Sequence, residues 1–339
     1  MVASVADLGH HGDREVGPGL LDLAVNVYAG PRPAWLDSAL LAGLANAAAY
    51  PDPKAAEAAV AARHARPPAE VLATAGAAEA FTLVARWRPW RRPVVVHPQF
   101  TEPHASLVLA GHDVTEVVLP HPFLLDPALV PDDADLVVVG NPTNPTGVLH
   151  PAAVLRSLLR PGRVVVVDEA FMDAVPGQPE SLADQPHPGL VVLRSLTKHW
   201  GIPGVRAGYL LGDPHAVAQL RRLQTPWSVS SPAIAAMLAC STPAADAESE
   251  RRARELTAWR GHLALGLARL GIEHVPSTAS FVLARVGAGQ HAALRAAGIA
   301  VRRADTFPGL DDAWVRIAAR PPAVTDHLLS ALSAHAAMP

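Results

Sequence analysis

The sequence has a single cysteine, Cys240, among its 339 residues, so no disulfide can form within the chain and a reducing compartment fits. No uninterrupted apolar run approaches the roughly 18 residues of a membrane-spanning helix. The net charge of −3 gives no indication of a nucleic-acid or acidic-membrane partner. The N-terminal stretch MVASVADLGHHGDREVGPG lacks the basic start and apolar run of a signal peptide. We therefore expect a soluble cytoplasmic protein that binds neither nucleic acid nor membrane.

Lysine is almost as rare as cysteine, because only Lys54 and Lys198 are lysines among 28 lysines and arginines. Lys54 lies in an alanine-rich amphipathic segment, where a solvated surface role is expected. Lys198 lies in SLTKHWGIPGVRAG. Unlike arginine, a lysine that is buried or close to other cations can lose its proton and act as a nucleophile that forms Schiff bases. In a chain that otherwise uses arginine, this chemistry marks Lys198 as a candidate catalytic residue.

The middle of the chain alternates short apolar runs with helical segments. Runs such as LVVVG and RVVVVD show no polar alternation, which is typical of strands buried on both faces. The pattern predicts an α/β fold with a mostly parallel sheet covered by helices. From about residue 243, one long helix, short strands and a final helix predict a smaller α+β domain. We expect an arm and helix over 1–48 that belong to the small domain, a large domain over 49–242 and a C-terminal small domain over 243–339.

Polar residues follow several predicted strands, at the sheet edge where open α/β proteins bind ligands. Gly76, Ala77 and Ala78 open a helix whose free N–H groups suit an anion, although an ordinary turn is the alternative. Asn144 lies in NPTNPTG, where two Asn-Pro steps hold the loop extended, but a plain turn also fits. Asp168 follows a run of buried valines, so its carboxylate requires a core ion pair or a charged ligand.

These residues together suit pyridoxal 5′-phosphate. Asp168 would pair with the protonated pyridine nitrogen of the cofactor, and Asn144 would hydrogen-bond the 3-oxygen of the ring. Phe100, which follows another strand, could stack on the ring. The cofactor phosphate would be held by Gly76, Ala77, Ser195, Thr197 and Arg206.

The order of the motifs resembles the fold-type I pyridoxal-phosphate aminotransferases over nearly the whole chain. The motifs are GAAE, NPTNPTG, DEAF, SLTKHWGIPGVRAGY and VRIAAR. Three further stretches, HHGDREVGPGLLDLAVNV, QTPWSVSSPA and VRRADTFPGLDDAWVRIAARPP, resemble the threonine-phosphate decarboxylases of cobalamin biosynthesis, which are sisters of the histidinol-phosphate aminotransferases. The resemblance implies the aminotransferase class I/II fold, pyridoxal phosphate as cofactor and a homodimer with composite active sites.

The resemblance also implies roles for single residues. Lys198 would hold the cofactor and carry the proton, with Asp168, Asn144 and Arg206 around it. The other residues with implied roles are Tyr50, for the cofactor phosphate of the neighbouring subunit; Arg316, for the substrate carboxylate; Asn26, lining the pocket; and Arg302, Arg320, His10 and His11, near a substrate phosphate. The chain departs from the family at Phe171, where aminotransferases place a tyrosine, at Pro103 and at Ala78, which offers no polar side chain.

Three hypotheses about function follow. The main prediction is a lyase that decarboxylates L-threonine O-3-phosphate to (R)-1-amino-2-propanol O-2-phosphate. The alternative is an aminotransferase that acts on histidinol phosphate or another amino acid and requires a 2-oxo acid acceptor such as 2-oxoglutarate. A non-catalytic binding protein is the third, but such a protein has no need to keep Lys198, Asp168 and Arg206 together.

Overall fold

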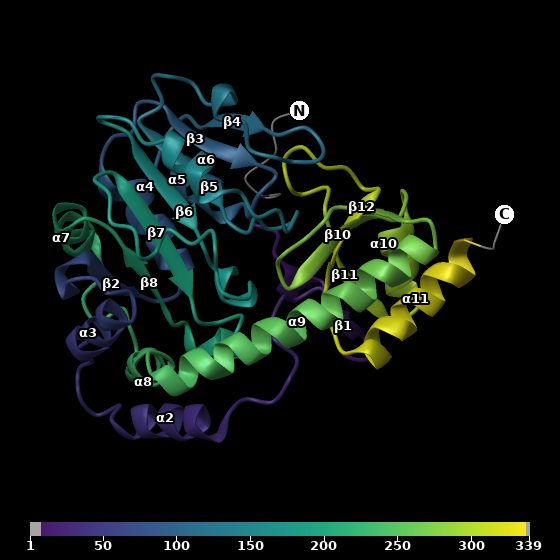
Figure 1. Ribbon diagram of the computed structural model, residues 1–339, viewed down its shortest axis with the longest axis horizontal. Coiled ribbons are helices and arrows are strands. Elements are labelled where there is room, and N and C mark those ends of the chain that lie inside the picture. The colour runs from purple at the N-terminus through teal and green to yellow at the C-terminus, as the bar shows by residue number, and fades with distance from the viewer. Residues whose placement is uncertain (1–7, 337–339) are drawn as a thin grey trace.

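The computed structural model describes residues 8–336, and their strands form one sheet of seven strands and one of five (Figure 1). The larger sheet has the order β2-β8-β7-β6-β5-β3-β4. Its strands are β2 (Val71–Thr74), β3 (Pro93–His97), β4 (Thr115–Val118), β5 (Leu136–Gly140), β6 (Val164–Asp168), β7 (Leu190–Ser195) and β8 (Gly208–Leu211). Strands β3 to β7 run parallel, whereas β8 is antiparallel to both β7 and β2. The predicted fold, an α/β protein with a mostly parallel sheet, is confirmed.

The valine-rich strands are buried because helices cover both faces of this sheet. In β6, Val165 and Val167 pack into one apolar cluster, whereas Val164 and Val166 pack into the cluster on the opposite face. The first cluster includes side chains of α2 (Ala34–Ala45), α3 (Lys54–Arg63), α6 (Ala152–Ser157) and α8 (Ser231–Cys240). The second includes side chains of α4 (Ala77–Trp87), α5 (Glu102–Leu109) and α7 (Pro214–Leu223). Burial on both faces explains why the strands lack polar alternation.

The smaller sheet has the order β1-β11-β12-β10-β9. Its strands are β1 (Leu21–Leu23), β9 (Glu273–His274), β10 (Phe281–Arg285), β11 (Ile299–Arg303) and β12 (Trp314–Ala318). Helices α9 (Pro243–Arg269), α10 (Gln290–Ala296) and α11 (Pro322–Ala336) accompany it, and α9 runs from α8 to α11 along both sheets (Figure 1). Five 3-10 turns complete the described elements: η1 (Gly12–Arg14), η2 (Pro68–Glu70), η3 (Pro127–Leu129), η4 (Met172–Ala174) and η5 (Pro203–Val205).

The N-terminal arm is less irregular than its sequence indicates. Its β1 pairs in parallel with β11, a strand that the sequence pattern did not reveal. The next helix, α2, lies against α8 instead of the smaller sheet (Figure 1). The domain boundaries at 48/49 and 242/243 stay predictions. Residues 1–7 and 337–339, at the two ends of the predicted domains, lie outside the described residues. Residues 1–7 also begin the stretch that lacks the features of a signal peptide. Between residues 8 and 336, no helix has the length and apolar character needed to cross a bilayer.

Candidate active site

Lys198 lies in the turn directly after β7, at the carboxyl edge of the parallel strands. The residue is half-buried, and its backbone carbonyl accepts a hydrogen bond of 3.0 Å from the N–H of Tyr28. Burial lowers the pKa of Lys198 to about 8, and the guanidinium groups of Arg316 and Arg206 act in the same direction. The amine therefore has a neutral, nucleophilic fraction near neutral pH.

Asp168 ends β6, and its backbone pairs with that of Gly140 on β5 and of Leu193 on β7. The side chain is only 8% exposed, and its Oδ1 accepts a 3.0 Å hydrogen bond from the Ala170 N–H. No lysine, arginine or histidine among the described residues forms an ion pair with it. Burial therefore raises the pKa of Asp168 to about 6. A buried carboxylate without a cation is suited to a positively charged ligand group.

The residues expected to hold a phosphate meet at the start of α4. Gly76 precedes the helix with φ 76°, and no side chain caps the helix N-terminus. A β-carbon placed on Gly76 would approach Nη2 of Arg206 to 2.5 Å, so the guanidinium lies directly against the glycine. Ser195 and Gly208 are cross-strand partners, and the Ser195 Oγ lies 2.8 Å from the Thr197 Oγ1. The N-terminus of α4, the Arg206 guanidinium and the strand ends that carry the two hydroxyls thus lie close together.

Gly76→Ala is expected to weaken cofactor binding about tenfold, because a side chain is strained at positive φ and would displace Arg206. Fluorescence titration of the cofactor-free protein with pyridoxal phosphate measures the effect. Gly271→Ala is the matched control, since Gly271 has φ 69° but nothing within 4 Å of an added β-carbon. Equal affinities of the two variants would show that the contact at Gly76 is not part of a phosphate site.

Arg316 and Asn144 are in direct contact. Nη1 of Arg316, on β12, donates to Oδ1 of Asn144 at 2.6 Å, and its Nη2 donates to the Ala24 carbonyl at 2.6 Å. With its amide oxygen turned toward the arginine, Asn26 accepts from Nε and Nη1 at 3.1 Å. Burial and the neighbouring charge of Arg302 lower the pKa of Arg316 to about 9. The loop after β5, the N-terminal arm and the smaller sheet therefore meet at this guanidinium.

The N-terminal arm crosses from one sheet to the other next to Arg316. The Nε2 of His11 lies 3.2 Å from the Oε2 of Glu102. His10 and His291 both bind Glu15, and Arg302 Nη1 is 3.7 Å from the same carboxylate. The pKa of Glu15 falls to about 2, since these hydrogen bonds and charges outweigh its burial. The arm is thus held by residues of α5, α10 and β11.

Arg302, Phe100 and Arg320, which were also expected near the site, contact other residues of the same chain. Arg302 also donates to the His10 carbonyl at 2.6 Å and to the Thr306 hydroxyl at 2.7 Å. The ring of Phe100 lies between those of Phe81 and His11, at 6.1 and 5.3 Å between centroids. Arg320 donates to the carbonyls of residues 22, 25, 27 and 319, which makes it a clamp for the N-terminal arm.

Phe171 and Tyr50 lie in very different surroundings. The buried ring of Phe171 packs edge-on against Phe281 at 5.0 Å, and Arg316 lies over that second ring. Tyr50 is 78% exposed and stacks on Trp227, itself 61% exposed, at 4.5 Å between centroids. The structure does not place Tyr50 in contact with the residues around Lys198 of the same chain.

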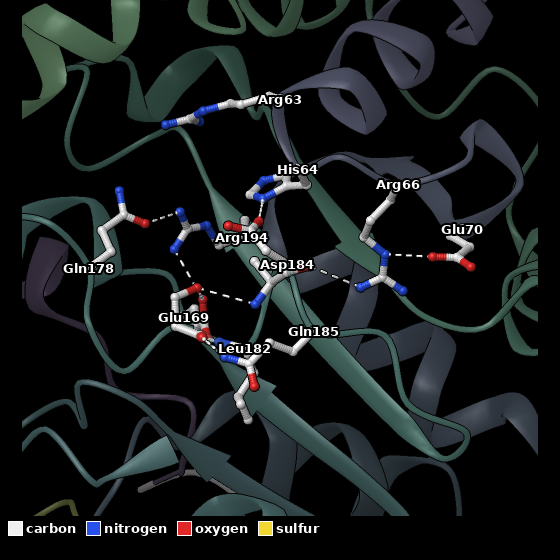
Figure 2. Close-up of polar contacts among 12 residues, drawn as sticks. Arg63, His64, Arg66, Glu70, Glu169, Gln178, Leu182, Asp184, Gln185 and Arg194 are labelled. Carbon is white, nitrogen blue, oxygen red and sulfur yellow. Dashed lines mark hydrogen bonds and ion pairs between the residues drawn. The ribbon is translucent and has the colours of Figure 1, made fainter. Parts of the chain in front are cut away.

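Sequence reasoning missed two charged residues next to the site, Glu169 and Arg194. Glu169 follows Asp168 directly, and Arg194 precedes Ser195 directly. Figure 2 shows the side chains of Glu169 and Arg194 in contact with each other. The signal was present, since a charged residue inside or at the end of an apolar strand requires a partner.

The described residues fit pyridoxal phosphate. Asp168 has a buried carboxylate that lacks a cation, the start of α4 has uncapped N–H groups, and Lys198 has an amine with a lowered pKa. The cofactor carries the complementary groups: a ring nitrogen that accepts a proton, a phosphate and an aldehyde.

Comparison with known proteins identifies the family. The sequence model of the family Aminotransferase class I and II matches residues 18–332. A histidinol-phosphate aminotransferase of Mycobacterium tuberculosis is 49% identical over 317 residues, which cover 92% of this chain and 87% of that protein. The threonine-phosphate decarboxylase of Salmonella typhimurium is 33% identical over 92% of this chain and 90% of its own. The crystal structure of a histidinol-phosphate aminotransferase from Clostridium acetobutylicum has a TM-score of 0.85 at 24% identity, covering 93% of this chain and 99% of that one.

These similarities correct the main functional prediction. The prediction of a decarboxylase, a lyase of cobalamin biosynthesis, is wrong, because the 49% identity to histidinol-phosphate aminotransferases far exceeds the 33% identity to the decarboxylase. A physical reason is that His10 and Arg302, in two of the stretches that suggested the decarboxylase, both bind Glu15 within the chain. Such residues hold the arm whichever reaction the protein catalyses.

The family also fixes the cofactor, which is pyridoxal 5′-phosphate. Fold-type I aminotransferases act on small amino-acid-type substrates and are typically homodimers. The family model matches residues 18–332, and the fold is shared along nearly the whole chain. The chain therefore belongs to the class I and II aminotransferases.

Proposed function

We propose that the chain is an aminotransferase that moves an amino group between histidinol phosphate, or a closely similar phosphorylated amino compound, and a 2-oxo acid. The observation that supports this most is the 49% identity to histidinol-phosphate aminotransferases over 92% of the chain. When bound, pyridoxal phosphate supplies an electron sink that stabilises negative charge at the substrate carbon. The protein supplies the lysine, the charges and the shape of the site.

Lys198 and Asp168 are assigned the chemical roles. Lys198 would hold the cofactor covalently between turnovers and move a proton to and from the substrate carbon, which requires an amine that is easily deprotonated. Asp168 would keep the ring nitrogen protonated, because its buried carboxylate is stabilised by a positive charge. Asn144, Ser195, Thr197 and Arg206 would orient the cofactor.

Two buried arginines favour a substrate with an anionic group. Arg302 and Arg316 are cross-strand partners on β11 and β12. Burial lowers the pKa of Arg302 to about 10 and that of Arg316 to about 9. Arg302 already has the Glu15 carboxylate at 3.7 Å, whereas Arg316 forms no ion pair among the described residues, so an added anion would chiefly offset the burial of the Arg316 charge. We assign the 2-oxo acid carboxylate to Arg316 and the substrate phosphate to the region of Arg302 and His11.

The test is to supply the purified holoenzyme with histidinol phosphate and 2-oxoglutarate and to measure glutamate. We expect many turnovers with both compounds and a single turnover when the oxo acid is omitted. Threonine phosphate, supplied alone, serves as the second arm. Continuous release of CO₂ from threonine phosphate without any 2-oxo acid would contradict the proposal.

We also propose that the protein is a homodimer in which Tyr50 of each subunit contributes to the other's site. Tyr50 and Trp227 are exposed, as are Leu41 and Leu44 on the nearby α2, at 68% and 61%. A second copy of the chain would cover these apolar side chains.

Mixing a Tyr50 variant, in which cofactor binding is weakened, with an inactive Lys198 variant is expected to restore activity. In a heterodimer of Tyr50→Phe and Lys198→Ala subunits, one of the two sites combines a normal Lys198 with a normal Tyr50. Recovery of up to half of the activity per heterodimer, measured after mixed refolding or co-expression, would support the composite site. An active monomer in light scattering, or no recovery in isolated heterodimers, would contradict it.

A further inference from the structure

A cluster of buried charges lies beside the strand ends that carry the cofactor residues. At its centre is Arg194 on β7, whose side chain is 2% exposed. Its Nη1 donates to Glu169 Oε2 at 3.1 Å, and its Nη2 donates to Asp173 Oδ1 at 3.1 Å and to Gln178 Oε1 at 2.5 Å. Figure 2 shows Glu169 and Gln178 reaching the guanidinium from different sides. We call Arg194, Glu169, Asp173 and Gln178 the Arg194 cluster.

The cluster is adjacent in sequence to the residues that face the cofactor. Glu169 follows Asp168, and Arg194 precedes Ser195, so the two members of this ion pair are each one residue away from a cofactor residue. Successive side chains of a strand point to opposite faces of the sheet. Arg194 and Ser195 therefore point to opposite faces of the sheet, with the cluster on one side and the cofactor residue on the other.

The cluster also fixes the chain between β6 and β7. The Glu169 N–H donates to the Leu193 carbonyl at 2.9 Å, and the Glu169 carboxylate accepts from the Leu182 N–H and the Ser181 hydroxyl, both at 2.7 Å. Asp173 belongs to η4, which begins directly after Phe171. One guanidinium therefore joins the end of β6, the turn after Phe171 and the strand that leads to Lys198.

Stability alone does not account for this arrangement. A buried ion pair loses the hydration of both partners, and well-packed apolar residues of similar volume are often equally stable. A guanidinium that binds two carboxylates at once does what apolar residues cannot, since its planar donors fix the relative positions of both acceptors.

We propose that Arg194 is a positioning residue for the cofactor site, which holds Asp168 and Lys198 in their relative positions by joining Glu169 to Asp173. Its effect on cofactor binding depends only on the family assignment. Its effect on turnover rests on the proposed aminotransferase function.

Arg194→Lys in the holoenzyme tests the proposal, because lysine keeps the charge but cannot bind both carboxylates in one plane. Arg163→Lys is the matched control. Arg163 is also buried, lies at the opposite end of β6, and donates to the carbonyls of residues 131, 132, 134 and 158 without entering the Arg194 cluster. Four measurements are compared: the dissociation constant of pyridoxal phosphate, the visible absorption spectrum of the bound cofactor, the steady-state constants kcat and KM, and the thermal midpoint of unfolding.

We expect Arg194→Lys to raise the cofactor dissociation constant and to lower kcat, each about tenfold, with KM changed less than about twofold. The spectrum of the bound cofactor should change as well. Arg163→Lys should lower the thermal midpoint by a similar amount and leave the other three quantities unchanged. Glu169→Gln keeps the shape of the side chain that binds Arg194 but removes its charge, so it should reproduce the effects of Arg194→Lys. If Arg194→Lys does not fold, Glu169→Gln is used in its place.

Equal cofactor affinity and spectrum in Arg194→Lys and Arg163→Lys would overturn the proposal and leave Arg194 with a structural role only. The binding measurement needs no substrate. If histidinol phosphate is not a substrate but Arg194→Lys still binds the cofactor weakly, then the proposed function fails and the positioning role stands.

Discussion

Lys198→Ala is expected to lower kcat by about a thousandfold or more while the protein still folds. Arg316 and Arg206 lie close enough to the Lys198 amine to help lower its pKa, and the value of about 8 gives the amine a neutral fraction at physiological pH. Alanine removes both the group that would hold the cofactor and the group that would carry the proton. Asp168 and Arg206 remain, so the variant should still bind pyridoxal phosphate, although more weakly.

The rarity of lysine makes the control for this experiment unusually clear. The only other lysine in the sequence, Lys54, is 86% exposed and lies 3.6 Å from Asp52, so Lys54→Ala should leave kcat unchanged. After borohydride reduction of the holoenzyme, mass spectrometry should find the cofactor on the peptide with Lys198 and not on the one with Lys54. Label on Lys54, or near-normal turnover by Lys198→Ala, would contradict the assignment.

Lys198→Arg separates charge from nucleophilicity. Arginine keeps a positive charge beside Arg206 and Arg316 but does not lose its proton in this range. We expect this variant to be as inactive as Lys198→Ala. In the unmodified protein, the rate at which the cofactor-free form captures pyridoxal phosphate should rise with pH and level off above about pH 8, because only the neutral amine reacts.

The layered fold is readable from the sequence because its strands are governed by local composition. The valines of β6 must be buried on both faces wherever they lie, and they indicate a covered parallel strand without knowledge of its neighbours. Strands β1 and β11 are different. Leu21–Leu23 is a three-residue strand whose partner is Ile299–Arg303, so its pairing depends on the arrival of a distant segment. No local pattern specifies such a contact.

Candidate site residues can be chosen from the sequence as far as single residues carry distinct chemistry. Lys198 is a candidate because lysine is rare in this chain, and Asp168 is a candidate because it follows a buried strand; both roles stay predictions. Arg194 and Glu169 escaped notice because each is one charge at a strand end, and only the paired register of β6 and β7 brings them together. The reaction was mispredicted for a related reason. Decarboxylation and transamination depend on which substrate bond the pocket aligns, and this alignment is not encoded in a motif.

Asp168→Asn should lower kcat about a hundredfold and yet make the cofactor-free protein more stable. The lost activity follows from the loss of the negative charge that would hold a proton on the ring nitrogen. The gain in stability follows from the pKa of Asp168, which burial raises from 3.8 to about 6. Between these two values the unfolded chain has lost the proton that the folded chain keeps, so rising pH favours unfolding.

The ionisation of Asp168 lowers the free energy of unfolding by about 3 kcal/mol at most, and this loss is complete above about pH 6. An asparagine side chain cannot ionise, so in urea unfolding at pH 7 the Asp168→Asn variant should be more stable than the parent by up to this amount. The difference should shrink as the pH falls toward about 4. Saturating pyridoxal phosphate should reverse the order, because the charged aspartate then gains its missing partner.

Asp173→Asn provides a control of the opposite sign, five residues along the chain. Asp173 is buried too, but Arg194 and Arg63 more than compensate for its burial and lower its pKa from 3.8 to about 2. Its charge therefore stabilises the fold above about pH 4, and this stabilisation is lost as the pH falls toward about 2. Asp173→Asn should destabilise the cofactor-free protein at pH 7 by about 2 kcal/mol or more, since it also leaves Arg194 with one carboxylate fewer. Asp168→Asn and Asp173→Asn should therefore change the free energy of unfolding at pH 7 in opposite directions. If both change it in the same direction, Asp168 does not carry an uncompensated buried charge that awaits the cation of a ligand.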